Sequence, residues 1–127
     1  MKIKDLKEAR YMLKKKSENE INAITAEIVE EIKKLLKGDI YKIMLYGSYA
    51  RGDFDSESDI DIMIIMNCKR EEVCHYRKQV SRVASRIGLE NDIEISLLLR
   101  DRNTFEQSRN VLPFYKNIQR EGVALYG

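Results

Sequence analysis

Two aspartates open an otherwise apolar run in this chain, and no other feature restricts its fold as strongly. The run, D-I-D-I-M-I-I-M over residues 59–66, has the length and apolar content of a strand that enters a core. Residues two apart on a strand point to the same face, so Asp59 and Asp61 should present their carboxylates side by side. Unpaired charges in such a place are costly. A divalent cation would offset their repulsion, and hard oxygen ligands suit magnesium.

Two further strands and a connecting helix are predicted around this run. Residues 40–46, I-Y-K-I-M-L-Y, form a short buried strand that runs into Gly47. Residues 93–99, I-E-I-S-L-L-L, form a third strand. A helix over 70–87, ended by Gly88, connects the second strand to the third. A crossover of this length implies that these two strands are parallel.

The N-terminal part of the chain is predicted to be helical. Ser17 and Glu20 match a capping box, in which each side chain bonds the backbone N–H of the other. The apolar positions that follow recur three or four residues apart and form one stripe: Ile21, Ile24, Ile28, Ile32, Leu35 and Leu36. Gly38 can take the left-handed conformation that ends a helix. A weaker amphipathic segment precedes this helix, with Ile3, Leu6, Arg10 and Leu13 on it.

The C-terminal part is predicted to be short and mixed. Pro113 can occupy the first turn of a helix that closes at Gly122, and an extended tail over 123–126 follows. The whole chain is then one α/β domain with a small mixed sheet and flanking helices. Its parts are an N-terminal helical segment (1–38), a core (40–100) and a C-terminal helix and tail (101–127).

Composition excludes several classes of protein. A chain of 127 residues with 43% apolar residues and a single proline is one ordinary domain, neither disordered nor multi-domain. No apolar run approaches the roughly 20 residues that span a bilayer, and the N-terminus lacks a secretory h-region, so a cytoplasmic location is expected. The net charge of +2 does not favour binding to nucleic acid. Cys68, Cys74 and His75 are too few for a zinc site and are expected to be reduced.

The segment between the first two strands has the composition of a phosphate-binding turn. Gly47 and Ser48 follow a strand directly, and a small, flexible pair lets backbone N–H groups and a hydroxyl approach a phosphate, above all if a helical turn begins at residue 48. Arg51 adds a cation, although an ion pair with Asp53, Asp55 or Glu57 is an equal expectation. Together with a magnesium-binding pair at Asp59 and Asp61, this turn predicts a site for a nucleoside triphosphate.

A third acid would complete a two-metal site. Asp92 and Glu94 are two residues apart near the start of the third strand and are expected to share a face. By distance from the end of the strand, Glu94 lies nearer the level of Asp61, so we favour Glu94 and keep Asp92 as its rival.

The spacing of these residues resembles a known signature. Gly47-Ser48, then ten residues, then Asp59-x-Asp61 resembles the motif of the polymerase-beta-like nucleotidyltransferase superfamily. The small size is similar to its minimal nucleotidyltransferases, one-domain proteins commonly encoded beside a HEPN-domain partner. The strands and crossover helix extend the resemblance over residues 40–100. The segment P-F-Y-x-N-I-x-x-E-G, residues 113–122, is similar to a bacterial and archaeal subgroup.

The resemblance implies a role for each residue of the motif. Gly47 and Ser48 would hold the β and γ phosphates of a nucleotide such as ATP. Asp59 and Asp61 would hold magnesium, and the third-strand acid would help with a second ion and with the acceptor hydroxyl. Family members usually carry aspartate at that third position, whereas this sequence offers Asp92 or Glu94. The implied reaction is attack by an acceptor oxygen on the α-phosphorus, with pyrophosphate leaving.

Three functions follow from the resemblance, in order of preference. The first is transfer of AMP to a HEPN-domain partner protein, as the antitoxin of a toxin–antitoxin pair. The second is a non-catalytic, nucleotide-binding antitoxin that occludes its partner. The third, transfer to a small molecule such as an aminoglycoside, ranks last because only about 25 residues follow the third strand. For the same reason the acceptor half of the site is expected from another chain, without membrane or nucleic-acid template.

Overall fold

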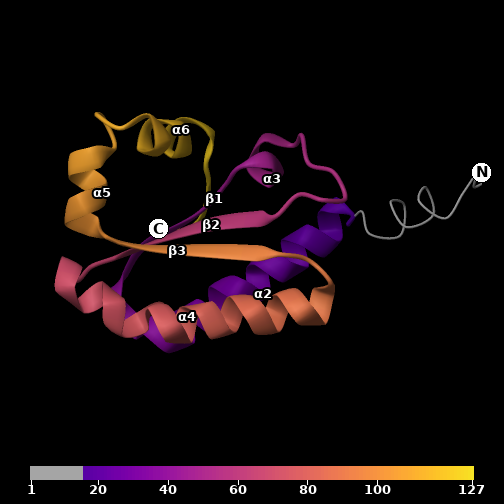
Figure 1. The fold of residues 1–127 in the computed structure, drawn as a ribbon, viewed down its shortest axis with the longest axis horizontal. Coiled ribbons are helices and arrows are strands. Elements are labelled where there is room, and N and C mark those ends of the chain that lie inside the picture. Colours follow the sequence, from indigo (N-terminus) through magenta and orange to yellow (C-terminus); the bar gives the residue numbers. More distant parts are fainter. Residues whose placement is uncertain (1–15) are drawn as a thin grey trace, which may run out of the picture.

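The computed structural model describes residues 16–127, which form a four-stranded sheet with helices on both faces (Figure 1). The strand order is β3-β2-β1-β4, in which β1 is antiparallel to β2 and β4, and β2 is parallel to β3. The elements are α2 Glu18–Leu36, η1 Lys37–Asp39, β1 Ile40–Tyr46, α3 Ser48–Arg51, β2 Ile60–Met66, α4 Arg70–Asn91, β3 Ile95–Asp101, α5 Arg102–Ser108, α6 Pro113–Glu121 and β4 Val123–Tyr126. The predicted α/β class with a mixed sheet is confirmed.

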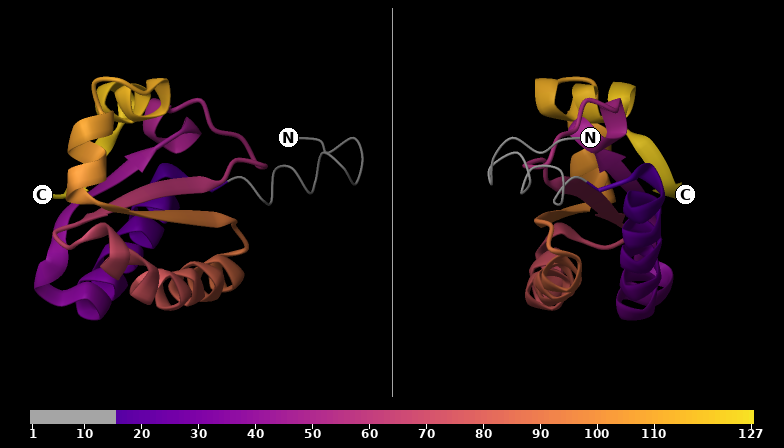
Figure 2. Two further views of the ribbon diagram at one scale, coloured as in Figure 1. Left: turned by 60° about the vertical axis from the view of Figure 1, so that its left-hand side comes forward. Right: turned by 90° about the vertical axis from the view of Figure 1, so that its right-hand side faces the viewer.

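The two faces of the sheet are covered differently. Figure 2 shows α2 and α4 together on one face and α5 and α6 on the other. Alternation along β2 divides its side chains accordingly: Ile60, Ile62, Ile64 and Met66 pack in the core under α2 and α4, whereas Met63 and Ile65 pack in a smaller cluster with Phe105, Tyr115 and Ile118. Asp61 shares the face of Met63. Asp61, the acidic residue of β2, therefore lies on the side of the sheet that α5 and α6 cover.

The start of α2 is as predicted, and its end is not. Ser17 caps the helix in a complete capping box with Glu20. The left-handed residue at the other end is Lys37, with φ of 52°, and not Gly38. The core residues Leu36 and Ile40 are only four positions apart, so the chain has to reverse immediately after Leu36, through the short η1 turn. The predicted segment with Ile3, Leu6, Arg10 and Leu13 lies outside the described residues.

The end of α4 also differs from the prediction. Gly88 lies within the helix, which continues to Asn91 and is capped by Asp92 in the left-handed conformation, with φ of 50°. A Cβ atom on Gly88 would come 2.7 Å from the backbone oxygen of Ile93. This glycine is therefore required for close packing of the helix on the chain that leaves it, and does not stop the helix. As a result β3 begins at Ile95, two residues later than predicted.

The C-terminal elements agree with the sequence. Pro113 begins α6, and β4 is the predicted extended tail, paired with β1. The helix α5 was not predicted; Asp101 caps it by accepting a hydrogen bond of 2.8 Å from the N–H of Thr104. Within residues 16–127, no helix combines the length and the apolar content required to cross a bilayer.

Candidate functional site

The turn after β1 brings a tight glycine corner and a single helical turn together. Gly47 has φ of 77°, and its carbonyl accepts hydrogen bonds of 3.1 Å from the N–H groups of Ala50 and Arg51. The turn ends at Gly52, with φ of 84°, whose N–H donates to the Ser48 carbonyl at 2.9 Å. A helical turn thus begins at Ser48, as expected. The first N–H groups of such a turn point out of it and are available to an anion.

Asp61 lies directly against this turn. It pairs with Tyr46 across the antiparallel strands, one residue before Gly47. A Cβ atom on Gly47 would fall 2.5 Å from Oδ2 of Asp61, which is closer than two such atoms can approach. Glycine at position 47 is therefore necessary for two reasons, its positive φ and the carboxylate beside it. The structure brings together the turn over residues 47–52, which is predicted to bind phosphate and is called the phosphate turn, and the second aspartate of the motif.

The electrostatics of Asp61 show that Asp59 is its neighbour. Burial raises the pKa of the Asp61 carboxyl above its ordinary value, the negative charge of Asp59 raises that pKa further, and Arg51 opposes both effects. Two carboxylates and a guanidinium therefore share one electrostatic environment. The repulsion between the carboxylates is the condition that a bound divalent cation relieves.

The strand register places the two rival acids differently. Ile60 pairs with Ile95, and its N–H donates to the Glu94 carbonyl at 3.0 Å. Glu94 is therefore at the level of Asp59, and Ser96 is the residue opposite Asp61. Of the two rivals Glu94 is therefore nearer the level of Asp61, as expected: it lies two positions before Ser96, whereas Asp92 lies four positions before it.

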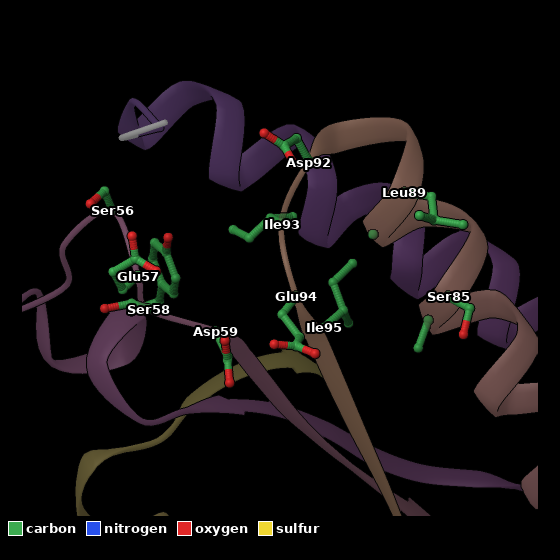
Figure 3. Close-up of a pocket in the computed structure, with 13 residues that line it drawn as sticks. Ser56, Glu57, Ser58, Asp59, Ser85, Leu89, Asp92, Ile93, Glu94 and Ile95 are labelled. Carbon is green, nitrogen blue, oxygen red and sulfur yellow. The ribbon is translucent and has the colours of Figure 1, made fainter. Parts of the chain in front are cut away.

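Asp92 is not on the third strand at all. It caps α4 in a left-handed conformation, so the expectation that it shares a strand face with Glu94 is wrong. In Figure 3 the Glu94 side chain lies close to Asp59, and Asp92 lies farther away, where the chain leaves α4. Among residues 16–127, no three histidine, cysteine or acidic side chains are placed closely enough to form a metal-binding group. Asp59 and Asp61 are close enough to interact electrostatically, and within residues 16–127 no further acid forms a group of three with them.

A cavity of about 540 Å³ opens beside Asp59 and Glu94 (Figure 3). Its walls come from the loop before β2, the end of α4 and the start of β3. The lining residues are Tyr49, Ser56, Glu57, Ser58, Asp59, Ala84, Ser85, Gly88, Leu89, Asp92, Ile93, Glu94 and Ile95. The cavity therefore adjoins the carboxylates of Asp59 and Glu94. Neither Gly47 nor Asp61 lines it.

Arg51 is held by two carboxylates. Its Nε lies 3.2 Å from Asp53, one of the three expected partners, and its NH1 group lies 3.5 Å from Glu121 at the end of α6. Asp55 instead accepts a hydrogen bond of 2.8 Å from the N–H of Glu57 within the loop. The sequence did not predict the ion pair with Glu121. This residue was named only as part of the segment 113–122 and was given no role. The C-terminal helix thus reaches the phosphate turn.

Aromatic rings flank the turn on both sides. Tyr46 packs edge-on against Phe114 of α6, with ring centroids 5.8 Å apart, and Tyr49 stacks on Phe54 at 4.5 Å. Burial, and then the charge of Asp61, raise the pKa of Tyr46 to about 12. Tyr46 is therefore a neutral, packed side chain at physiological pH. Of the two tyrosines, Tyr49 is the one that lines the cavity.

Comparison with known proteins identifies the family. A family model described as nucleotidyltransferase domain matches residues 25–124. Two proteins of Methanocaldococcus jannaschii, both named "putative protein adenylyltransferase", are similar to the chain. One is 34% identical over 108 residues, covering 85% of this chain and 99% of the relative. The other is 38% identical over 80 residues, covering 63% of this chain and 79% of the relative.

A solved structure shows the same fold. The crystal structure of a nucleotidyltransferase from Sulfolobus solfataricus, named putative, superposes with a TM-score of 0.53 at 22% identity, over 87% of this chain and 89% of that one. A glycine corner, a one-turn helix and two neighbouring aspartates at one end of the two central strands thus occur in a chain that the family model covers over most of its length. The chain belongs to the nucleotidyltransferase domain family.

Proposed function

We propose that this protein is a magnesium-dependent nucleotidyltransferase that transfers AMP from ATP to a hydroxyl group of a partner protein. The observation that carries the proposal is the contact between the phosphate turn and the paired aspartates, in which Oδ2 of Asp61 occupies the space where Gly47 has no Cβ. Two relatives named as protein adenylyltransferases support AMP as the transferred group and a protein as the acceptor.

The residues present fit magnesium. Asp59 and Asp61 supply hard carboxylate oxygens, and the pKa of Asp61 is raised by burial and by the charge of Asp59. Asp59 and Asp61 would hold the metal, and Glu94, level with Asp59, is the acid we propose as third ligand. Asp92 is not proposed, because its backbone is committed to the helix cap. When bound, magnesium lowers the pKa of a hydroxyl and offsets phosphate charge.

The remaining residues bind and orient the nucleotide. The N–H groups that begin α3 and the Ser48 hydroxyl would hold the β and γ phosphates, with Arg51 adding positive charge. The acceptor oxygen then attacks the α-phosphorus, a new oxygen–phosphorus bond forms, and the bond to the bridging oxygen of pyrophosphate breaks. Glu94 is placed to receive the proton of the acceptor hydroxyl.

The partner that we propose is a HEPN-domain protein, with this chain as its antitoxin in the cytoplasm. The support is the resemblance of Gly47, Ser48, Asp59 and Asp61 to the minimal nucleotidyltransferases. The test incubates the full chain with magnesium, labelled ATP and the HEPN protein encoded beside it. Label should appear on the partner. Native partner that stays unlabelled would contradict the proposal.

Matched variants test the assignment of the metal pair. The double variant Asp59→Asn with Asp61→Asn should reduce transfer to background, because amides neither bind magnesium comparably nor carry charge. Asp39→Asn is the control: it removes one exposed carboxylate at the other end of β1, and transfer should persist. Circular dichroism verifies that each variant is folded. Transfer by the folded double variant would exclude the metal assignment.

One observation favours a second function. Within residues 16–127 no three histidine, cysteine or acidic side chains form a metal-binding group, which favours a chain that binds its partner and nucleotide without transferring AMP. A non-catalytic antitoxin acts by occlusion and does not need the carboxylates. In cells that express the partner, the double Asn variant should then still protect. Loss of protection by the folded double variant excludes occlusion alone.

A further inference from the structure

The cavity beside Asp59 and Glu94 has a composition that does not suit a triphosphate. Four of its lining residues are acidic, Glu57, Asp59, Asp92 and Glu94, and none of the described residues that line it is lysine, arginine or histidine. Gly47, Ser48 and Arg51, which suit phosphate, do not line it. Like charges in a partly enclosed space repel strongly, so the phosphate chain of a nucleotide is excluded from the cavity.

Two of the four acidic residues, Glu57 and Asp92, are not among the proposed metal ligands. Asp59 and Glu94 would be neutralised in part by bound metal, whereas Glu57 lies in the loop before β2 and Asp92 at the cap of α4. Glu57 and Asp92 line the cavity from two different segments of the chain (Figure 3). Their charges would therefore still face the cavity when the metal pair is occupied.

The remaining wall of the cavity is apolar. Ala84, Leu89, Ile93 and Ile95 line it from the end of α4 and the start of β3. Leu89 is 84% exposed at the rim of the cavity, so its side chain is accessible to a bound apolar group. The cavity thus offers one acidic side and one apolar side next to the proposed catalytic carboxylates, and a volume of about 540 Å³ accommodates a few side chains.

We propose that this cavity binds the acceptor, and that it selects a polypeptide segment in which the hydroxyl-bearing residue is flanked by lysine or arginine and by an apolar side chain. The inference rests on the proposed function, because it names the class of acceptor for that reaction. The positively charged side chains pair with Glu57 and Asp92, and the apolar side chain packs on Leu89. The acceptor hydroxyl then lies beside Asp59 and Glu94. Glu57 and Asp92 are specificity residues, and neither touches the reacting atoms.

Two matched peptides test this proposal by binding alone. Each carries one tyrosine, one serine, two leucines and a fluorophore; the first has four lysines and the second has four glutamates at the same positions. Fluorescence anisotropy with the full chain should show binding of the lysine peptide only. Equal binding of both peptides, or no binding of the lysine peptide, overturns the inference.

A double variant tests the two specificity residues. Glu57→Gln with Asp92→Asn should weaken lysine-peptide binding about three- to tenfold, since two exposed ion pairs are lost. Asparagine tolerates the left-handed conformation of residue 92, so the helix cap is retained. The control is Asp39→Asn with Glu71→Gln, which removes the same charge elsewhere. Glu71 is the second residue of α4 and Asp92 follows its last residue, so the two lie about 31 Å apart along the helix. Equal weakening by both pairs of substitutions would assign the effect to net charge and overturn the cavity assignment.

A filled cavity provides a steric test. Ser85→Trp places an indole in the cavity from α4 and should abolish peptide binding, while the thermal shift caused by magnesium and ATP is retained. Unchanged peptide binding by the folded variant overturns the inference. Labelled ATP then separates the two proposals. Selective binding of the lysine peptide with no label on any acceptor would contradict the proposed function alone. Equal binding and equal labelling of both peptides would contradict only the acceptor preference.

Discussion

Gly47 is the residue at which backbone conformation and site chemistry depend on each other. Its φ of 77° disfavours any side chain, and a Cβ atom would meet Oδ2 of Asp61. Gly47→Ala should therefore lower the free energy of unfolding by about 1–3 kcal/mol for the strained backbone conformation alone. It should also reduce AMP transfer about a hundredfold, because the carboxylate has to move. Urea unfolding and labelled-ATP transfer measure the two effects.

Gly52 is a control position that also has a positive φ but has free space around it. Its φ is 84°, and no atom lies within 4 Å of a Cβ built on it. Gly52→Ala should lose similar stability to the conformational strain while transfer is largely retained. If both alanine variants lose transfer equally, the contact with Asp61 is not what makes Gly47 necessary.

Asp61 gives the site a pH dependence that magnesium should reverse. Burial and Asp59 raise its pKa, so this carboxyl favours the folded state only below its unfolded pKa of about 3.8, and that contribution is lost as the pH rises through the folded pKa. Asp61→Asn should therefore unfold at higher urea than the wild type at pH 7 in EDTA. The difference should vanish at pH 3.

Adding magnesium should reverse the difference in stability between the wild type and Asp61→Asn. Saturating magnesium should stabilise the wild type and leave Asp61→Asn nearly unchanged, since only the wild type keeps the paired carboxylates. Equal stabilisation of both proteins would place the metal elsewhere.

At the scale of elements, apolar pattern and turn residues locate the strands of the site but not their ends. The strand over 40–46 was predicted to the residue, because Gly47 marks its end. The third strand was placed two residues early because Gly88 was interpreted as a helix stop. Its packing against Ile93 is a long-range requirement that a local pattern does not contain. The same error placed Asp92 on a strand.

The ion pair of Arg51 with Glu121 shows a second limit. The two residues are far apart in the sequence, and their contact depends on how α6 lies across the sheet. Motif spacing within 47–61 predicted the aspartate pair and the phosphate turn, because both lie on adjacent strands. The spacing of the motif contains no information about α6, which follows much later in the sequence.

Asp101 shows how a single cap joins two elements. It ends β3, is only 4% exposed, and accepts from the N–H of Thr104 in α5. Burial raises its pKa, but the hydrogen bonds from Thr104 outweigh burial and hold the pKa below its ordinary value. Asp101→Ala should cost about 1–2 kcal/mol at pH 7.

The pH profile distinguishes this cap from a packing effect. A depressed pKa contributes stability above the unfolded pKa, and that stability is lost as pH falls through the folded pKa. The difference between wild type and Asp101→Ala should therefore shrink below about pH 4. A difference independent of pH would contradict the role of the ionised cap.

For the whole molecule, the sheet separates the scaffold from the site. Ile62 faces α2 and α4 and is fully buried, whereas its neighbour Asp61 faces the other side. Ile62→Ala should cost about 2–5 kcal/mol through lost burial and a cavity. Transfer measured well below the melting temperature should stay within about twofold of the wild type, because the substitution leaves the site face unchanged.

A loss of activity in folded Ile62→Ala would show that the two faces are coupled. Thermal unfolding monitored by circular dichroism gives the stability, and a transfer assay at low temperature gives the activity.

The order of the strands has a consequence for synthesis on the ribosome. β1 lies inside the sheet between β2 and β4, yet β4 is made after every other described element. A nascent chain that has reached only α6 therefore carries β1 as an edge strand, with unpaired backbone groups open to any other strand. Val123–Tyr126 close that edge, so the newly made protein is protected from wrong pairing only once its last strand has emerged.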